Sequence, residues 1–172
     1  MKIVNKQVLL DKPPARIIQI EVNAPEIAAK ARAGEFVVVM VSENGERVPL
    51  TIADTNLIKG TITLIFQEAG YTTGLLGALE CGAELYALVG PLGHATEIRK
   101  YGKIILVGGG VGIGEIYPVA KAFKKALNHV TTVLGARSKD FLILENELRA
   151  HSDEFIVTTD DGSYGRKGFT TD

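Results

Sequence analysis

The sequence predicts two modules: an antiparallel β-barrel over residues 1–98, followed by part of a parallel α/β domain over residues 99–172. Short apolar or alternating segments separated by turn signals fill the first module, which is typical of small barrels and sandwiches. From Tyr101 onward, strand-like and helix-like segments alternate. A glycine-rich stretch, Gly108–Gly114, joins the first strand of the second module to its first helix.

The first module contains strand-like segments bounded by turn dipeptides. The strands are expected over Ile17–Val22, Phe36–Val41, Thr61–Phe66 and Glu84–Val89. Dipeptides such as Pro13-Pro14, Asn44-Gly45 and Gly90-Pro91 separate these segments or flank them. A short helix is predicted over Tyr71–Leu79, because Thr72 or Thr73 would cap it and apolar residues recur along it.

The second module has the order strand, helix, strand, helix, strand, which predicts a parallel, doubly wound sheet. These elements are expected over Ile104–Val107, Glu115–Leu127, Val130–Leu134, Lys139–Ala150 and Phe155–Thr158. A complete domain of this type usually has about five or six strands. We therefore expect the chain to hold only the first part of the domain.

Composition narrows the function classes. The net charge is −1, so there is no basic footprint for nucleic acid. No apolar run approaches the length of a membrane span, and the N-terminus has no secretory signal, which predicts a cytoplasmic protein without a membrane partner. The single cysteine, Cys81, excludes an intrachain disulfide, and three scattered histidines show no metal-ligand spacing, so no metal site is expected.

The glycine stretch carries the clearest chemical signal. Glycines between a strand and a helix allow the backbone to turn tightly and approach a pyrophosphate, while the first helical N–H groups point at the anion. The spacing in Gly110-Val111-Gly112 differs from the usual G-x-G-x-x-G pattern. A nucleotide ligand is the prediction, and a tight turn that binds nothing is the alternative.

Three further motifs give the order of parts a specific meaning. They are Arg47–Asp54, Gly70–Thr73 and Val89–Gly93, all in the first module and all before the glycine stretch. This layout resembles the ferredoxin–NADP reductase superfamily, in which an FAD-binding β-barrel precedes a Rossmann-like NAD(P)-binding domain. Within the superfamily, the chain is similar to the flavin subunits of NADH-dependent ferredoxin:NADP oxidoreductase (sulfide dehydrogenase) and of dihydroorotate dehydrogenase.

The resemblance implies a flavin contact along Pro49-Leu50-Thr51. These residues match the strand that lies against the flavin ring, and the Thr51 hydroxyl would meet the N5/O4 edge as the candidate catalytic group. Arg47 would neutralise the FAD pyrophosphate. The family arginine usually lies three residues before the hydroxyl residue, where this chain has Val48, so a surface arginine is the alternative for Arg47.

The resemblance also implies FAD contacts from the turn before the predicted short helix. Gly70, Thr72 and Thr73 match the turn that binds the FAD phosphates, although either threonine would also serve as a simple helix cap. Phe66 and Gln67, together with the preceding Ile65, match a segment whose backbone contacts the ring or the ribityl chain. Gly90–Gly93 matches the signature that closes the barrel and is expected to be structural.

In the second module, the resemblance implies a pyridine-nucleotide site. The residues that match its loop are Gly109, Gly110, Val111 and Gly112. Glu115 stands where the family usually has proline, and its carboxylate would repel a pyrophosphate. Arg137 and Ser138 follow the second strand and match the adenosine ribose position. An arginine there would favour NADP. The nearby Asp140 leaves NAD open, and pairing of Arg137 with Asp140 or Glu145 is the alternative.

The loop Asp160–Gly168 resembles the acidic, glycine-containing loop after the third strand, where Arg166 and Lys167 would reach a phosphate; a solvated loop is the alternative. The function implied by the resemblance is that of a flavoprotein subunit that transfers electrons between NAD(P)H, FAD and an iron–sulfur centre. Its expected partners are a larger oxidoreductase subunit and ferredoxin. The [2Fe–2S] segment of such subunits would lie beyond Asp172, so we expect a C-terminally shortened chain. The alternatives are the dihydroorotate dehydrogenase electron-transfer subunit and a non-catalytic nucleotide-binding assembly subunit.

Overall fold

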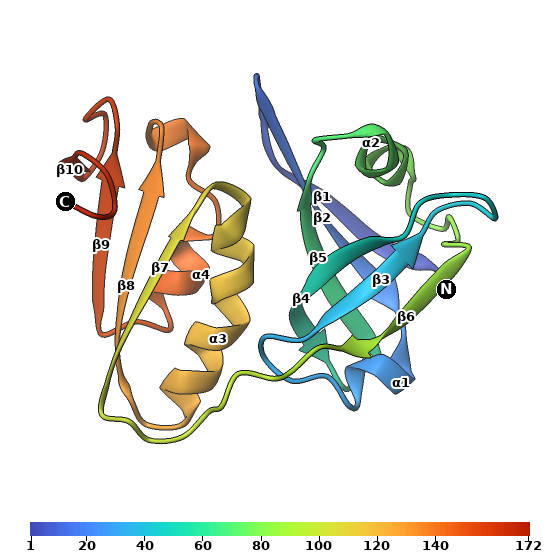
Figure 1. Cartoon of the computed structure of the whole chain (residues 1–172), viewed down its shortest axis with the longest axis horizontal. Coiled ribbons are helices and arrows are strands. Elements are labelled where there is room, and N and C mark those ends of the chain that lie inside the picture. The colour runs from blue at the N-terminus through green and yellow to red at the C-terminus, as the bar shows by residue number, and fades with distance from the viewer. The chain divides into compact units, whose positions relative to one another are not determined.

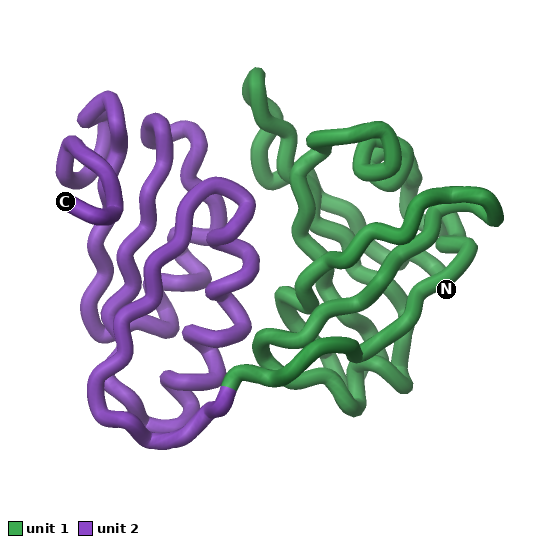
Figure 2. Tube along the Cα trace, viewed as in Figure 1, with its two compact units in different colours: residues 1–96 green, residues 97–172 purple.

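The computed structural model describes residues 1–172, which form two compact units. Unit 1 comprises residues 1–96 and unit 2 comprises residues 97–172 (Figure 2). No helix of either unit has both the length and the apolar character needed to cross a lipid bilayer.

Unit 1 is built on a six-stranded antiparallel sheet in the order β1-β2-β5-β4-β3-β6 (Figure 1). Its strands are β1 (Ile3–Lys12), β2 (Ala15–Asn23), β3 (Phe36–Met40), β4 (Val48–Asn56), β5 (Thr61–Gln67) and β6 (Ala87–Leu92). The two edges of the sheet meet through a single antiparallel bridge between Lys2 and Glu84. The predicted antiparallel, barrel-like architecture is confirmed, with one bridge in place of a full ladder between β1 and the segment before β6.

The core of unit 1 follows the alternation of apolar residues along the strands. Ile18, Ile20 and Val22 of β2 are fully buried, and so are Ile62 and Leu64 of β5. Two short helices complete this core: α1 (Pro25–Ala28) contributes Ile27, and α2 (Tyr71–Ala78) contributes Leu76. Because successive residues of a strand face opposite sides, the residues between these core positions lie on the outer face of the sheet.

The sequence prediction omitted β1. Its ladder with β2 shifts register twice, between Ile3 and Asn5 and between Val8 and Leu10. The shifts interrupt the alternation on which strand prediction depends, and Val8 is exposed although it is apolar.

Unit 2 contains a four-stranded, fully parallel sheet in the order β10-β9-β8-β7 (Figure 1). The strands are β7 (Lys103–Gly109), β8 (His129–Ala136), β9 (Glu154–Thr159) and β10 (Arg166–Lys167). The helix α3 (Ile113–Lys125) follows the short 3-10 helix η1 (Gly110–Gly112) and lies against β7 and β8. The predicted parallel sheet is confirmed, and β10 adds a short strand that the prediction lacked.

The predicted helix over Lys139–Ala150 is wrong. The chain forms two short pieces there, the 3-10 helix η2 (Lys139–Phe141) and the α-helix α4 (Glu145–Arg149). Between them the backbone is extended at Leu142, and Leu144 has a left-handed φ of 53°. A continuous helix cannot contain these conformations. The spacing of apolar residues in this segment is compatible with a helix and does not indicate the break.

A buried asparagine fixes the entry of the chain into unit 2. The Asn128 side chain is 3% exposed, and its Oδ1 accepts hydrogen bonds from the N–H groups of Tyr101 and Gly102. Its Nδ2 donates to the carbonyl oxygens of Arg99 and Phe123. One side chain thereby satisfies backbone groups of two segments that are distant in sequence, and no local pattern predicts these contacts.

Candidate functional site

The strands β4 and β5 of unit 1 separate where the predicted flavin residues lie. Along β4, residues 48–51 pair with β3, whereas the ladder between β4 and β5 runs only from Asn56 opposite Thr61 to Ile52 opposite Leu64. Residues 48–51 of β4 and 65–67 of β5 therefore lack a ladder partner on the sides where these two strands would otherwise meet. Unpaired strand backbone offers hydrogen-bonding groups to a ligand.

The predicted residues of β4 alternate between the core and the outer face. Leu50 and Ile52 belong to the core, so Pro49 and Thr51 face outward. Thr51 is half-buried opposite Phe36 of β3, and no hydrogen bond engages its hydroxyl. Arg47 lies immediately before β4, is exposed, and has no ion pair in the structure.

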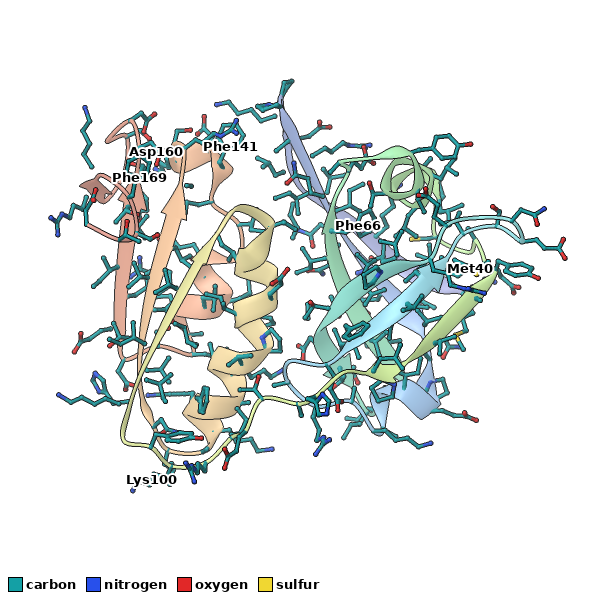
Figure 3. All side chains as sticks on the ribbon, in the orientation of Figure 1. Met40, Phe66, Lys100, Phe141, Asp160 and Phe169 are labelled. Atoms are coloured by element: carbon teal, nitrogen blue, oxygen red, sulfur yellow. The ribbon has the colours of Figure 1, made fainter.

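The predicted residues at the end of β5 differ in what they offer. Phe66 is 2% exposed and its side chain belongs to the core cluster (Figure 3), so only its backbone is open to a ligand. Gln67 is half-buried and pairs with Ile17 of β2. Ile65 is buried as well. This segment therefore fits a backbone contact rather than a side-chain contact.

The turn between β5 and α2 is held by its own side chains. The Thr73 Oγ1 accepts hydrogen bonds from the N–H groups of Ala69 and Gly70, each at 3.0 Å. This is the reciprocal half of a capping box, in which the third helical residue satisfies a backbone donor before the helix. Thr73 is thus engaged as a cap, which was one of the two roles considered for it.

Thr72 makes a contact that sequence reasoning missed. Its side chain is nearly buried, with 6% exposed, and its Oγ1 donates a 2.7 Å hydrogen bond to the Oε2 of Glu46. Glu46 lies on the connection between β3 and β4, next to Arg47. The motif Arg47–Thr51 begins one residue after Glu46, so the motif does not include the carboxylate that bonds this connection to α2.

Two glycines at the start of α2 are not required by packing inside the chain. A Cβ atom added at Gly70 or at Gly74 would have no heavy atom within 4 Å. At Gly77, by contrast, a Cβ would meet Glu68 and Ile18. The open space beside Gly70 fits a turn that a ligand approaches closely.

In unit 2, the glycine turn lies at the carboxyl end of the parallel strands. Gly110 has a left-handed φ of 56°, which favours glycine, and a Cβ atom at Gly110 or Gly112 would meet nothing within 4 Å. A Cβ at Gly108, in contrast, would lie 2.7 Å from Cδ1 of Ile116. Packing therefore explains Gly108, and backbone conformation explains Gly110, whereas the space at Gly112 is open.

The other predicted nucleotide residues lie at the same edge of the sheet. In the register of the parallel strands, Gly109 is opposite Gly135 and Ala136 is opposite Thr159, so Arg137–Ser138 and Asp160–Gly168 follow adjacent strand ends. Figure 3 shows Asp160 and Phe169 at this end of unit 2 and Lys100 at the opposite end. Carboxyl ends of parallel strands are where ligands bind in open α/β sheets.

The neighbourhood of Arg137 differs from one of the predicted alternatives. Glu145 bonds to Arg149 at 2.8 Å and accepts a 2.7 Å hydrogen bond from the hydroxyl of Tyr164. These partners, and chiefly the bond from Arg149, lower the pKa of the Glu145 carboxyl, while the same carboxylate raises the pKa of Tyr164. Glu145 therefore serves α4 and the loop after β9, and Arg137 is exposed at the end of β8.

The loop after β9 is internally bonded rather than simply solvated. Thr159 Oγ1 donates to the carbonyl of Tyr164 at 2.7 Å, and Asp161 Oδ1 accepts from the N–H of Ser163. The hydrogen bonds with Ser163 lower the pKa of the Asp161 carboxyl. The Ser163 hydroxyl in turn accepts from the N–H of Lys139. Arg166 and Lys167 form β10 and are exposed.

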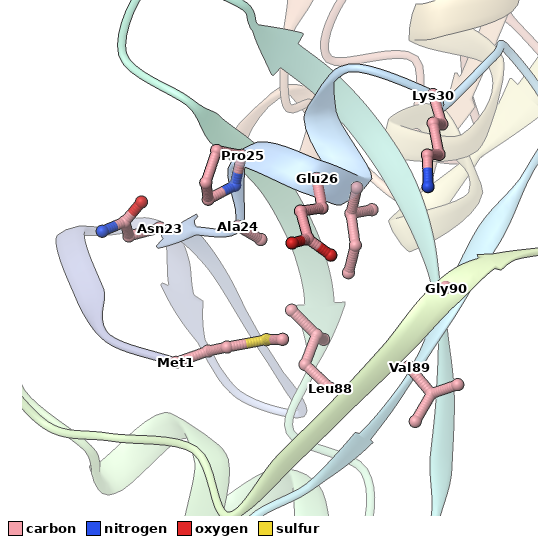
Figure 4. A pocket seen from close by; sticks show the side chains of 10 residues that line it. Met1, Asn23, Ala24, Pro25, Glu26, Lys30, Leu88, Val89 and Gly90 are labelled. Atoms are coloured by element: carbon pink, nitrogen blue, oxygen red, sulfur yellow. The ribbon is translucent and has the colours of Figure 1, made fainter.

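A cavity of about 480 Å³ lies elsewhere in unit 1, between α1 and β6 (Figure 4). Apolar side chains, including Met1, Ile27 and Leu88, line it together with Glu26 and Lys30. None of the predicted cofactor residues borders this cavity. It is therefore separate from the site formed by β4, β5 and α2.

No protein-family model matches the chain, but individual relatives do. A Thermotoga maritima homologue of the dihydroorotate dehydrogenase B (NAD⁺) electron-transfer subunit is 48% identical over 151 residues, which cover 88% of this chain and 53% of that protein. The corresponding Streptococcus mutans subunit is 34% identical over 151 residues, covering 85% of this chain and 58% of that one. The chain thus spans about half the length of these curated relatives.

Solved structures give the same answer for the fold. A structure of NADH-dependent reduced ferredoxin-NADP oxidoreductase superposes with a TM-score of 0.91 at 44% identity, covering 99% of this chain and 60% of that one. Ferredoxin-NADP⁺ reductase from Plasmodium falciparum superposes with a TM-score of 0.72 at 19% identity, covering 91% and 67%, which supports the fold alone.

These findings, together with the antiparallel and parallel units, show that the chain has the ferredoxin–NADP reductase fold. Its sequence relatives include an electron-transfer subunit of dihydroorotate dehydrogenase B and a homologue of that subunit, and a similar structure is that of the NADH-dependent ferredoxin-NADP oxidoreductase. The resemblance stated from the motifs is confirmed.

Proposed function

We propose that this chain is the flavin-binding part of an electron-transfer subunit that accepts electrons from NAD(P)H and passes them to a partner protein. The carrying observation is the separation of β4 and β5 at residues 48–51 and 65–67, beside the glycine turn that opens α2. Unpaired backbone, an outward hydroxyl without a partner and a glycine beside open space are groups that can bind the polar edge and the phosphates of FAD.

FAD fits this part of unit 1 in the following way. Thr51 would donate its free hydroxyl to the flavin ring, and the backbone of 65–67 would hold the ring or the ribityl chain. Gly70, Thr72 and Arg47 would hold the two phosphates, because a glycine turn at a helix start and an exposed guanidinium both favour anions. When bound, FAD supplies the capacity to accept a hydride and to release electrons singly.

Unit 2 would hold the pyridine nucleotide. The open space beside Gly112 and the left-handed Gly110 suit a pyrophosphate at the start of α3. Arg137 and Ser138 follow the neighbouring strand, where they would meet the adenosine ribose or its 2′-phosphate. The exposed Glu115 in the first turn of α3 weakens attraction for an anion, so the nucleotide is expected to bind reversibly.

The partner is proposed from the chemistry of electron transfer and from the relatives. The Streptococcus relative is an electron-transfer subunit of a dihydroorotate dehydrogenase, the Thermotoga relative is a homologue of that subunit, and the similar structure is a ferredoxin-NADP oxidoreductase. A larger oxidoreductase subunit is therefore the proposed partner. That subunit would exchange electrons with ferredoxin or would oxidise dihydroorotate. Activity assays on the co-purified native complex would distinguish these two, since one complex would oxidise dihydroorotate and the other would exchange electrons with ferredoxin.

The function is tested by mixing the FAD-loaded protein with NADH or NADPH under anaerobic conditions and following the visible absorption of the flavin. Bleaching by one or both nucleotides is expected. An Arg137→Ala variant should lose more of its response to NADPH than to NADH. FAD that stays oxidised with both nucleotides, in a protein that binds FAD, would contradict the proposed role of unit 2.

A further inference from the structure

The carboxylate of Glu46 is hydrogen-bonded to the first turn of α2. The Oε2 of Glu46 accepts the hydrogen bond from the Thr72 hydroxyl at 2.7 Å, and Thr72 is 6% exposed. The first N–H groups of an α-helix have no partners within the helix, and the helix dipole favours negative charge at this end. The Glu46 carboxylate therefore binds a hydroxyl of the same helical turn whose N–H groups and dipole would favour a phosphate.

We propose that Glu46 competes with the FAD pyrophosphate for the first turn of α2 and thereby sets the preference of this chain between FAD and flavins that lack phosphate. This inference rests on the proposed function, because it takes the turn Gly70–Thr73 as the phosphate site. Thr72 has one hydroxyl hydrogen to donate, so it cannot bond Glu46 and a phosphate at once.

The cost to a bound phosphate has two parts. A hydrogen bond to a carboxylate is stronger than one to a neutral oxygen, so Glu46 holds Thr72 firmly. If Glu46 stayed in place, its charge would also repel the phosphate over a few ångströms. Glu46 is exposed on the connection between β3 and β4, which leaves it room to swing into solvent.

The neighbouring residues make the exchange plausible on structural grounds. Arg47 is exposed and has no ion pair, so it is available to a phosphate once Glu46 has left. Thr73 cannot substitute for Thr72, because its Oγ1 is occupied with the N–H groups of Ala69 and Gly70. The competition therefore falls on Thr72 alone among the two threonines.

The test compares Glu46→Gln with the wild-type chain by quenching of flavin fluorescence on binding. Glutamine keeps an acceptor for Thr72 and removes the charge. The variant should bind FAD about tenfold more tightly and bind riboflavin with unchanged affinity. Glu43→Gln is the matched control, because Glu43 is an exposed carboxylate on the same connection without a contact to α2, and it should change neither affinity appreciably.

Each outcome separates the inference from the proposed function. Equal FAD affinity in the wild type and Glu46→Gln, or weaker affinity in the variant, would overturn the competition while leaving FAD binding intact. An equal gain for riboflavin and FAD would also overturn it. No FAD binding by either chain would overturn the proposed function and this inference together. Glu46→Ala, checked for folding by thermal unfolding, should reproduce the gain for FAD if the charge is the cause.

Discussion

The glycine turns of the two units share one chain order, strand then glycine then helix, but differ in how the helix start is satisfied. In unit 1, Thr73 caps the turn and Thr72 bonds Glu46, so side chains of the chain occupy the first turn of α2. In unit 2, no side chain caps α3, and the space beside Gly112 is open. A ligand phosphate would have to displace a partner at α2 but not at α3.

The difference explains how two turns with the same order of elements would bind different ligands. For a cofactor that stays bound, contacts along β4, β5 and α2 would offset the free-energy cost of displacing Glu46 from Thr72. A nucleotide that enters and leaves in each cycle is better served by an open turn, with the exposed Glu115 limiting its affinity. Substitutions and changes of pH in the two units test this contrast.

The largest effect is expected from Asn128→Ala in unit 2. The change removes two hydrogen bonds from the N–H groups of Tyr101 and Gly102 and two to the carbonyls of Arg99 and Phe123, most of them partly buried, which should cost about 3 kcal/mol. Urea unfolding followed by hydrogen exchange should show the loss in unit 2. Asn146→Ala, at an exposed position on α4, is the control and should change little; equal losses in both variants would refute the assignment.

Two glycine substitutions in the glycine turn of unit 2 should differ in their effect on the free energy of unfolding. Gly108→Ala should destabilise unit 2 by about 0.5–1.5 kcal/mol, because its Cβ would lie 2.7 Å from Cδ1 of Ile116 and the end of that side chain would have to leave its preferred rotamer. Gly112→Ala should leave stability unchanged or raise it by about 0.5–1 kcal/mol, since Gly112 already has helical dihedrals and open space.

Nucleotide affinity should be affected more by Gly112→Ala than by Gly108→Ala, which is the reverse of their effects on stability. Gly112→Ala fills the space proposed for the pyrophosphate and should weaken NAD(P)H binding about tenfold in a well-folded protein. Calorimetric titration with NADH and NADPH measures this. Unchanged nucleotide affinity in Gly112→Ala would remove the case for a nucleotide at this turn.

A smaller effect is expected at the flavin edge. Thr51→Val keeps a β-branched side chain on β4 and removes a hydroxyl that has no partner in the chain, so stability should stay within about 0.5 kcal/mol. Loss of one hydrogen bond to the flavin should slow its reduction by NAD(P)H about three- to tenfold. Thr63→Val, on β5 where the strand pairs with both β2 and β4, is the matched control. If the flavin is reduced at the wild-type rate in both variants, Thr51 does not contact the flavin.

The smallest expected effect is the response of unit 2 to acid. Hydrogen bonds from Arg149, Lys124 and Ser163, respectively, lower the pKa of the carboxyls of Glu145, Asp153 and Asp161, and all three lie in unit 2. A carboxyl whose pKa is lowered by folding stabilises the protein above its unfolded pKa, about 4, and this contribution is lost as the pH falls through the folded value.

Unit 2 should therefore open more readily as the pH falls below about 4. Hydrogen exchange, corrected for its intrinsic dependence on pH, reports each unit separately. The dependence should be shallower in Asp161→Asn, which removes one of the three groups. Earlier loss of protection in unit 1 than in unit 2 would contradict the expectation.

Much of the fold was predictable because it depends on local patterns. Alternation along Ile17–Val22 and Thr61–Phe66 identified the central strands, and the order of elements after Tyr101 identified the parallel sheet. The break at Leu144 was not predictable, because apolar residues on either side imitate a helix. The strand β1 was missed because its register shifts disrupt the alternation.

The candidate site was predictable in outline and not in its contacts. The motifs around Thr51, Gly70 and Gly110 drew attention through glycines, a threonine and their spacing. The bond between Glu46 and Thr72 joins residues 26 positions apart, and no local pattern encodes such a pair. The four hydrogen bonds of the Asn128 side chain are all made with backbone groups, which exist at every residue, so the sequence does not indicate which of them are bonded.

The central claim is that unit 1 holds FAD between β4, β5 and α2. The most direct measurement is the visible absorption spectrum of the purified protein after incubation with FAD and removal of the excess, followed by identification of the flavin released on denaturation. Paired flavin bands and released FAD, close to one per chain, are the predicted result. A folded protein that stays colourless would contradict the account.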